Sequence, residues 1–167
     1  DFGQIDMLFM GGGSDREQSL VYADLVQKAD LLFAQLEAGL PVLCICGAYQ
    51  LLGAYYQSYE GQVMQGLGFF PFYTAGQRDR LIGNILLEAE IDGAASTLVG
   101  FENHGGRTWF QDSELQPLGR VVVGHGNNGQ DQTEGMRFCN LVGTYLHGPL
   151  LPKNPVLADD FIRNMAA

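Results

Sequence analysis

The sequence predicts an α/β protein, a three-layer sandwich in which helices cover both faces of a mostly parallel sheet. Two observations support this. In the first half, short apolar runs alternate with segments of helical periodicity over residues 5–56, as in strand–helix–strand units. The apolar runs are continuous, which is typical of strands buried inside such a sheet. With 167 residues, of which 46% are hydrophobic and 17% charged, we expect a single globular domain.

The first half is expected to contain, in order, a strand, a glycine-rich loop, a helix, a second strand, a tight turn and a second helix. Ser14 can cap the first helix and Gly39 can end it, because glycine tolerates the left-handed conformation found after helices. The expected ranges are a strand at 5–10, a loop at 11–13, a helix up to Gly39, a strand at 42–46 and a helix at 49–56.

The second half is richer in strand signals, separated by Gly and Asn clusters. Strands are expected at 81–89, 108–110, 120–123 and 140–146, followed by a closing helix at Pro155–Met165. The chain also opens almost directly on a core-type strand, whereas open parallel sheets usually begin with a complete strand–helix unit. We therefore expect the single domain at residues 1–167 to lack an N-terminal strand–helix unit.

Composition limits the classes of partner. The formal net charge of −10 argues against nucleic acid and anionic lipid, because both reward Lys and Arg; the alternative is that the charge serves solubility. No apolar run is long enough to span a bilayer, so we expect no membrane insertion. No signal peptide opens the chain, and three cysteines do not suggest a disulfide framework, which favours a reducing, cytoplasmic setting.

Cys46 stands where a predicted buried strand meets a predicted helix. Such an elbow holds a nucleophile in a sharp turn at the carboxyl end of a strand, facing the substrate crevice. Gly47 and Ala48 are small enough for the crowded backbone. The N-terminus of the following helix would lower the thiol pKa and offer N–H groups to an oxyanion. The alternative is an inert cysteine buried in the strand.

A cysteine nucleophile needs an acid/base partner, and the chain has three histidines. His147 follows the apolar run 141–146 and precedes Gly148-Pro149, so it also stands at a strand end. The carboxyl ends of parallel strands meet at one edge of a sheet, so Cys46 and His147 could meet across the crevice. The alternative for a single histidine is a surface or packed core position.

Three motifs resemble, in order and spacing, the class I glutamine amidotransferases: GGGSD at 11–15, CGAYQ at 46–50 and YLHGP at 145–149. The segments FENHGGRT at 101–108 and GTYLHGPLL at 143–151 narrow the resemblance to the cobyric-acid-synthase-type branch, and most closely to the GatD-type subunits of lipid II isoglutaminyl synthases. The similarity runs over nearly the whole chain and implies the same three-layer α/β fold.

This resemblance implies a role for each site residue. Cys46 would attack the glutamine carboxamide and His147 would transfer the proton. The loop that ends at Gly13 and the N–H of Gly47 would form the oxyanion hole. Two further residues would contact or support the substrate: Arg80 matches the arginine that pairs with the glutamine α-carboxylate, a task that suits a guanidinium fork, and Gln50 matches the glutamine of the elbow motif, which either contacts the substrate or braces the site. Without the resemblance, Arg80 would be taken as a solvated surface charge.

The sequence departs from the family pattern at two places in the motifs. The elbow usually reads C-x-G-x-Q, but its middle position is Ala48, so that position must not need a positive φ. Many class I enzymes carry an acid two residues after the histidine, where this chain has Pro149. The site is therefore either a Cys–His dyad, or its orienting carboxylate comes from elsewhere, with Glu102 as a candidate.

The implied reaction is hydrolysis of L-glutamine to L-glutamate and ammonia through a γ-glutamyl thioester on Cys46. The sequence has no G-x-x-x-x-G-K-[ST] loop, so we expect no cofactor in this chain, with ATP and Mg²⁺ on a partner. No metal site is expected, because no second Cys or His pair at ligand spacing follows Cys44 and Cys46. The resemblance implies a heterodimer with MurT, a Mur-ligase-like ATP-dependent subunit, which would amidate the D-glutamate of lipid II in peptidoglycan synthesis.

Two other functions stay open. One is the glutaminase domain of a cobyric or cobyrinic acid synthase, which an attached synthetase domain in the full-length protein would favour. The other is a non-catalytic binding module on the same fold, against which the intact Cys46 and His147 argue.

Overall fold

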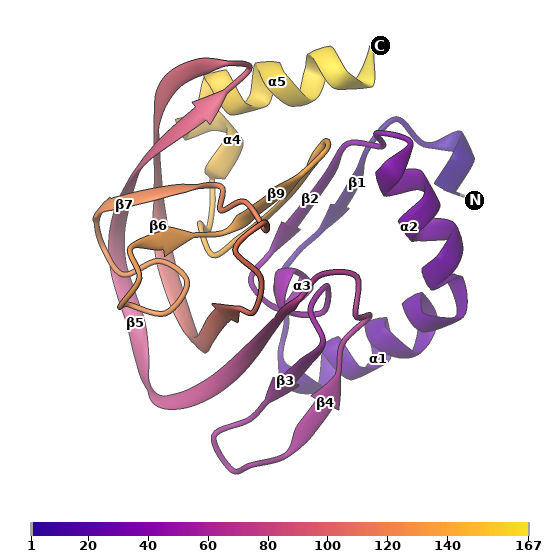
Figure 1. The fold of residues 1–167 in the computed structure, drawn as a ribbon, viewed down its shortest axis with the longest axis vertical. Helices are drawn as coiled ribbons and strands as arrows, with labels where there is room; N and C mark the ends of the chain where they lie inside the picture. Colours follow the sequence, from indigo (N-terminus) through magenta and orange to yellow (C-terminus); the bar gives the residue numbers. More distant parts are fainter. Residues whose placement is uncertain (1, 167) are drawn as a thin grey trace.

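The computed structural model describes residues 2–166, whose strands form two sheets (Figure 1). The first sheet has four strands in the order β1-β2-β10-β9, all parallel except for the β9–β10 pair. This sheet matches the predicted mostly parallel sheet and places the carboxyl ends of β1, β2 and β10 at one edge. The bounds are β1 Leu8–Met10, β2 Val42–Ile45, β9 Met136–Phe138 and β10 Leu141–Thr144.

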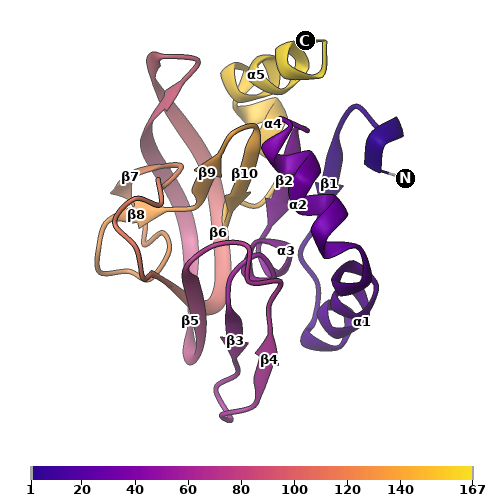
Figure 2. The same ribbon diagram turned by 45° about the vertical axis from the view of Figure 1, so that its right-hand side comes forward.

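The second sheet has six strands in the order β4-β3-β5-β7-β8, with β6 paired to β5. It is antiparallel except for the β3–β5 pair, so the parallel arrangement predicted for the chain holds in the first sheet only. Its bounds are β3 Tyr55–Gln57, β4 Val63–Gln65, β5 Phe72–Ile91, β6 Ala94–Phe110, β7 Gly119–Val123 and β8 Thr133–Glu134. In Figure 2 the β3–β4 pair extends below the rest of the molecule.

The helical segment expected up to Gly39 forms two helices, α1 (Asp15–Leu25) and α2 (Ala29–Glu37), separated by the 3₁₀ turn η2 (Val26–Lys28). A further 3₁₀ turn, η1, covers Phe2–Gln4. The predicted start is confirmed, because the N–H of Ser14 donates to the Glu17 carboxylate at 2.7 Å, half of a capping box. Gly39 has a φ of 92°, so the predicted glycine stop is confirmed too.

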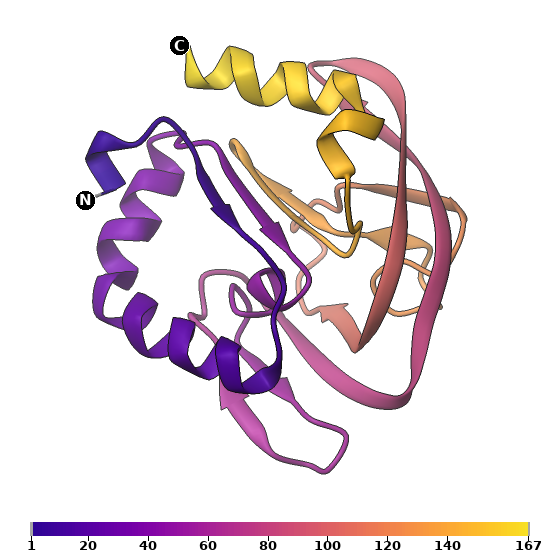
Figure 3. The same cartoon turned by 180° about the vertical axis from the view of Figure 1, so that it is seen from behind.

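The two central strands of this sheet, β2 and β10, are buried on both faces, because their side chains alternate between two hydrophobic clusters. Val42 and Cys44 pack with leucines of α2, whereas Leu43 and Ile45 pack with β5, β6 and the closing helix. Figures 1 and 3 show α1 and α2 on one side of this sheet and the long β5–β6 hairpin on the other. The α/β class with helices on the sheet is confirmed, although the hairpin provides most of the layer on the second face.

The helix expected at residues 49–56 is wrong over most of its length. The helix α3 covers only Gly47–Gln50, and the chain then turns into β3. Gly53 explains the turn, since a Cβ atom there would lie 2.4 Å from the Phe72 ring. Ala54 N–H donates to the Phe72 carbonyl at 2.8 Å, so tertiary pairing with β5 overrides the helical spacing of the apolar residues.

The strand β6 is far longer than the expected 108–110. Its glycines, including Gly100 and Gly106, hide the strand signal in the sequence, because glycine is a poor strand former. A different signal was available: Ile91 pairs with Ala94, so Asp92-Gly93 forms a two-residue hairpin turn with positive φ at both positions. Asp-Gly is a preferred sequence for such turns.

The C-terminal segment follows the prediction. The helix α5 covers Pro155–Met165 as expected, preceded by the short helix α4 (Leu150–Lys153). The Asn154 side chain joins this segment to β6, accepting from Val99 N–H at 2.7 Å and donating to the Val99 carbonyl at 2.8 Å. Within residues 2–166 no helix is long and apolar enough to cross a membrane.

Candidate active site

The predicted elbow is present at Cys46, between β2 and α3. Cys46 has φ 54° and ψ −108°, a conformation that is costly for a residue with a side chain and that is characteristic of functional turns. Its backbone is held on both sides: its N–H donates to the Thr144 carbonyl at 2.8 Å, and its carbonyl accepts from Gln50 N–H at 3.0 Å. Ala48 has no positive φ, so a methyl group is tolerated at that position.

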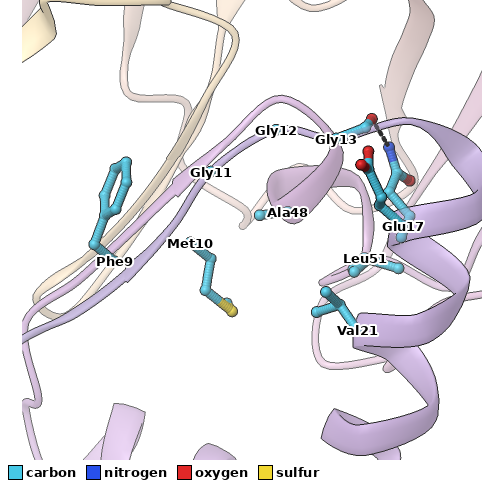
Figure 4. Close-up of a pocket in the computed structure, with 10 residues that line it drawn as sticks. Phe9, Met10, Gly11, Gly12, Gly13, Glu17, Val21, Ala48 and Leu51 are labelled. Carbon is cyan, nitrogen blue, oxygen red and sulfur yellow. Dashed lines mark hydrogen bonds between the residues drawn. The ribbon is translucent and has the colours of Figure 1, made fainter.

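Glycines allow other segments to approach this turn closely. A Cβ atom on Gly47 would lie 2.0 Å from Nε2 of Gln18, and one on Gly12 would lie 3.1 Å from Cβ of Cys46. The loop formed by Gly11, Gly12 and Gly13 runs past Ala48 at the start of α3 (Figure 4). The glycine-rich loop therefore lies directly against the predicted nucleophile.

A cavity of about 260 Å³ opens beside Cys46. It brings together four residues singled out from the sequence, namely Gly13, Cys46, Gln50 and Arg80. Cys46 and Gln50 follow β2 of the first sheet, Arg80 belongs to β5 of the second, and Gly13 lies in the loop before α1, so the cavity lies where the two sheets meet. The other lining residues were assigned no role from the sequence: Gln18, Tyr56, Ser58, Tyr59, Glu60, Gly76, Gln77, His104, Gly105 and Gly106.

Arg80 reaches the cavity from an irregularity in the β5–β6 hairpin. The pair Gly76–Gly106 is followed by the pair Leu81–His104, so residues 77–80 of β5 lie opposite the single residue Gly105 of β6. The Arg80 guanidinium donates from Nε to Oδ1 of Asn103 and from Nη2 to the Asn103 carbonyl, both at 2.8 Å. No carboxylate within residues 2–166 forms an ion pair with Arg80, so its charge remains available to a ligand.

Gln50 belongs to a buried polar network under the cavity. Its Nε2 donates to the Tyr145 hydroxyl at 3.0 Å, and that hydroxyl bonds with Oγ1 of Thr108 at 2.7 Å. The ring of His104 stacks on the ring of Tyr145, with centroids 3.7 Å apart and planes inclined by 5°. In this structure Gln50 therefore braces the site, and contact with a substrate stays a prediction.

His147 lies at the same sheet edge as Cys46, because β10 is the parallel neighbour of β2. Its N–H donates to the Phe101 carbonyl at 2.8 Å, which connects the end of β10 to β6. Its Nε2 is buried and makes no hydrogen bond within the described residues, and His147 is not among the residues that line the cavity. The shared sheet edge is as predicted, and the acid/base role stays a prediction.

Burial dominates the electrostatics of the two residues. It raises the pKa of Cys46, although the Gly47 N–H and the charge of Arg80 act in the opposite direction. Burial also lowers the pKa of His147, and His104 and Arg80 lower it further. The resting pair at neutral pH is thus a thiol and a neutral imidazole. The lowering of the thiol pKa expected from the helix N-terminus is outweighed by burial.

Glu102 does not orient His147 through a hydrogen bond. Its carboxylate is fully buried and accepts from the N–H groups of His125 at 2.8 Å and Gly126 at 2.9 Å. Its Oε2 lies 3.8 Å from Nε2 of His104. The assignment of Glu102 as the orienting carboxylate is therefore wrong, since its carboxylate binds the backbone of the loop after β7 and faces His104.

Two further observations delimit the site. A second hollow of about 390 Å³ lies under the glycine-rich loop, lined mainly by apolar side chains such as Met10, Val21 and Leu51 (Figure 4), and it does not include Cys46. Within residues 2–166 no three side chains of His, Cys, Asp or Glu gather to hold a metal ion.

Sequence reasoning did not identify Glu60, and it left His104 open between a position lining the site or a partner surface and simple packing. Glu60 lies in the loop between β3 and β4, and nothing in its neighbours marks an exposed loop acid as a site residue. His104 stood in a noted motif, FENHGGRT, but it is 1% exposed and packs beneath the cavity, so the motif alone could not separate packing from function.

Comparison with known proteins places this geometry in a family. The model of the CobB/CobQ-like glutamine amidotransferase domain matches residues 1–155. The chain is 47% identical over 158 residues to subunit GatD of lipid II isoglutaminyl synthase (glutamine-hydrolyzing) from Staphylococcus aureus strain N315, covering 95% of this chain and 63% of that protein. The corresponding GatD subunit from Streptococcus pneumoniae is 42% identical over 159 residues, with 95% and 60% covered. The chain thus spans about three fifths of the length of these relatives.

The fold is also found among solved structures. A crystal structure described as a glutamine amidotransferase superposes with a TM-score of 0.61 at 15% identity, covering 98% of this chain and 80% of the other. At that identity the likeness concerns the fold alone.

Proposed function

We propose that this chain, which belongs to the CobB/CobQ-like glutamine amidotransferase family, hydrolyses L-glutamine to L-glutamate and ammonia at the cavity beside Cys46. The observation that carries the proposal is the elbow itself. A cysteine with a φ of 54° at a strand–helix junction lines the same cavity as an arginine that has no carboxylate partner among the described residues. That combination suits a nucleophile facing the amide end of an amino acid whose carboxylate the arginine binds.

Glutamine would lie across the cavity. Arg80 would pair with the α-carboxylate, and the carboxamide would lie against Sγ of Cys46. Glu60 lines the same cavity and carries the charge that complements an α-ammonium group. The loop ending at Gly13 and the N–H of Gly47 would donate to the oxyanion, since the glycines bring the backbone close to the cysteine.

The proton steps follow from the resting charges. His147 takes the proton of the Cys46 thiol, and the sulfur attacks the carboxamide carbon to give a tetrahedral oxyanion. The imidazolium then protonates the leaving nitrogen, so ammonia departs and a γ-glutamyl thioester remains. Water, deprotonated by His147, attacks the thioester, and glutamate leaves while the thiol is restored. The first transfer requires Nε2 of His147 to come within hydrogen-bond reach of Sγ when glutamine binds, because Nε2 makes no hydrogen bond in this structure.

The ammonia would serve a second active site. Ammonia in water is mostly ammonium near neutral pH and is then a poor nucleophile, so direct delivery favours a stable complex. The GatD relatives are named as subunits of lipid II isoglutaminyl synthase. We therefore propose a heterodimer with MurT, a Mur-ligase-like subunit that holds ATP and Mg²⁺ and amidates the D-glutamate of lipid II in the cytoplasm. With a net charge of −10 on this chain, association with a basic patch on the partner would be salt-sensitive.

The test is to purify the full-length protein and the proposed Mur-ligase-like partner separately. Glutamate release and formation of amidated lipid II are then followed for each protein alone and for the mixture. We expect weak glutaminase activity alone, a complex on mixing, and product that depends on ATP and on Cys46. Cys139→Ser is a matched control, because Cys139 is also a turn cysteine with positive φ but is exposed. Full activity alone, with no complex, would exclude the partnership, and activity on cobyrinic acid instead would favour the synthase alternative.

A further inference from the structure

The irregularity that carries Arg80 needs its own support. Residues 77–80 of β5 lie opposite a single residue of β6, so regular ladder hydrogen bonds do not continue through this segment. Side chains of this segment are exposed, and exposed irregular backbone is usually the least stable part of a sheet. A guanidinium mounted there would be imprecisely placed unless something else fixed the backbone.

Arg107 supplies that support from β6. Its Nη2 donates at 2.8 Å to the Asp79 carbonyl, which belongs to the peptide bond joining Asp79 to Arg80. Its Nη1 donates at 3.1 Å to the carbonyl of Gly105, the residue opposite the bulge. One planar guanidinium therefore ties both sides of the irregularity together, which the single ammonium point of a lysine would do less well.

The two arginines have complementary tasks. Asn103 takes the Nε–Nη2 edge of Arg80, which leaves the Nη1–Nη2 end of the fork for a carboxylate. Arg107 fixes the peptide plane from which the Arg80 side chain departs. Arg107 forms no ion pair within the described residues, and its guanidinium donates its hydrogen bonds to backbone carbonyls instead.

We propose that Arg107 is a positioning residue for substrate selection: by clamping the Asp79 and Gly105 carbonyls, it holds Arg80 where the guanidinium meets the α-carboxylate of glutamine. The inference rests on the proposed glutaminase function. It assigns Arg107 no contact with the substrate, so loss of the clamp acts only through Arg80.

The test compares two amides on the full-length protein with its partner subunit present. The first is glutamine, and the second is 4-aminobutanamide, which is glutamine without the α-carboxylate. In R107M we expect KM for glutamine to rise about tenfold, with kcat within about threefold of wild type, because misplacement by a fraction of an ångström weakens binding more than it alters the chemistry. The kcat/KM for 4-aminobutanamide should stay within about twofold of wild type, because that substrate does not use Arg80.

Three controls make the result specific. The double variant R80A/R107M should be no worse with glutamine than R80A alone, since a residue that acts only through Arg80 adds nothing once Arg80 is gone. R120M is the matched surface control, because Arg120 lies in the same sheet in an exposed ion pair with Glu88 and should leave both substrates unaffected. Thermal melting of each variant checks folding. If R107M does not fold, R107K replaces it as the test variant: it keeps the charge but not the planar fork, and we expect it to raise KM for glutamine at least about threefold.

A wild-type KM for glutamine in R107M, or in R107K if R107M does not fold, would overturn the inference. The proposed glutaminase function would not be affected by that result. An equal loss with both amides would also overturn it, because it would mean a general structural role. A wild-type complex that neither binds nor hydrolyses glutamine would overturn the proposed function and this inference together.

Discussion

The two sheets contribute different kinds of residue to one cavity. The four-stranded sheet holds Cys46 at the end of β2, where backbone hydrogen bonds to Thr144 of the buried strand β10 and to Gln50 of α3 fix its position. The six-stranded sheet contributes Arg80, which is mounted on an exposed bulge and fixed by side chains. The difference indicates that the buried four-stranded sheet positions the nucleophile, whereas the irregular six-stranded sheet selects the substrate. Substitutions at the site residues of the four-stranded sheet should therefore change kcat, and substitutions at those of the six-stranded sheet should change KM.

The largest effect is expected for Cys46→Ser. A hydroxyl near neutral pH lacks the nucleophilicity of sulfur, so kcat for glutamine hydrolysis should fall by roughly three orders of magnitude or more. Glutamine binding should persist, because Arg80 is untouched. Glutamate release and calorimetric titration would measure the two quantities, with Cys139→Ser as the control. Near-normal turnover in the serine variant would remove Cys46 from the chemistry.

Arg80→Ala should have the opposite effect to Cys46→Ser, weakening glutamine binding more than it lowers kcat. Removing one partner of a desolvated ion pair typically costs roughly 2–5 kcal/mol, and the value here should lie at the lower end because Arg80 is exposed. The loss should appear in glutamine affinity, which is measured in the Cys46→Ser background. In the chain that keeps Cys46, kcat should be much less affected. An unchanged affinity would mean that Arg80 is a surface charge and that the proposed division between the sheets is wrong.

Glu134 tests the junction where the sheets meet. It is fully buried and accepts from Tyr145 N–H at 2.6 Å and from Oγ1 of Thr144, and burial raises its pKa from 4.5 to about 8. The folded chain then holds this proton more tightly than the unfolded chain, so unfolding releases it and the free energy of unfolding should fall by up to ~1.4 kcal/mol per pH unit between about pH 4.5 and 8.

Glu134→Gln mimics the protonated side chain, because its carbonyl can accept from Tyr145 while its amide donates to Thr144. Denaturant unfolding at several pH values should therefore show a flatter profile for the glutamine variant than for wild type over that range. Parallel profiles would mean that Glu134 does not titrate between the folded and unfolded states there.

The smallest effect is expected for Glu60→Gln. The side chain is exposed in the β3–β4 loop, so its attraction for the α-ammonium group of glutamine is screened and should be worth about 1 kcal/mol or less. KM for glutamine should rise by up to about fivefold, and KM for 5-amino-5-oxopentanoate, which lacks the amino group, should not change. Equal effects on both amides would show that Glu60 does not recognise the ammonium group.

Part of this architecture could be predicted from the amino-acid sequence. Continuous apolar runs predicted β2 and β10, Ser14 and Gly39 predicted the ends of the helical segment, and the small residues after Cys46 predicted the elbow. These features are local: burial on both faces, capping and steric crowding each leave a mark on a few neighbouring residues. The positions of Cys46, Gln50, Gly13 and Arg80 around one cavity also agree with the family resemblance.

The tertiary structure decided the features that depend on distant partners. Residues 49–56 have helical spacing, yet pairing with β5 makes their last part a strand, because Gly53 must pack on Phe72. The roles of the residues in the motif FENHGGRT depend on the folded hairpin. There Asn103 and Arg107 contact the bulge, and the ring of His104 stacks on Tyr145. The pKa of Cys46 likewise depends on burial by segments far along the chain, which outweighs the local effect of the helix. Local steric and capping preferences are encoded in adjacent residues, whereas register, desolvation and side-chain clamps exist only once the chain has folded.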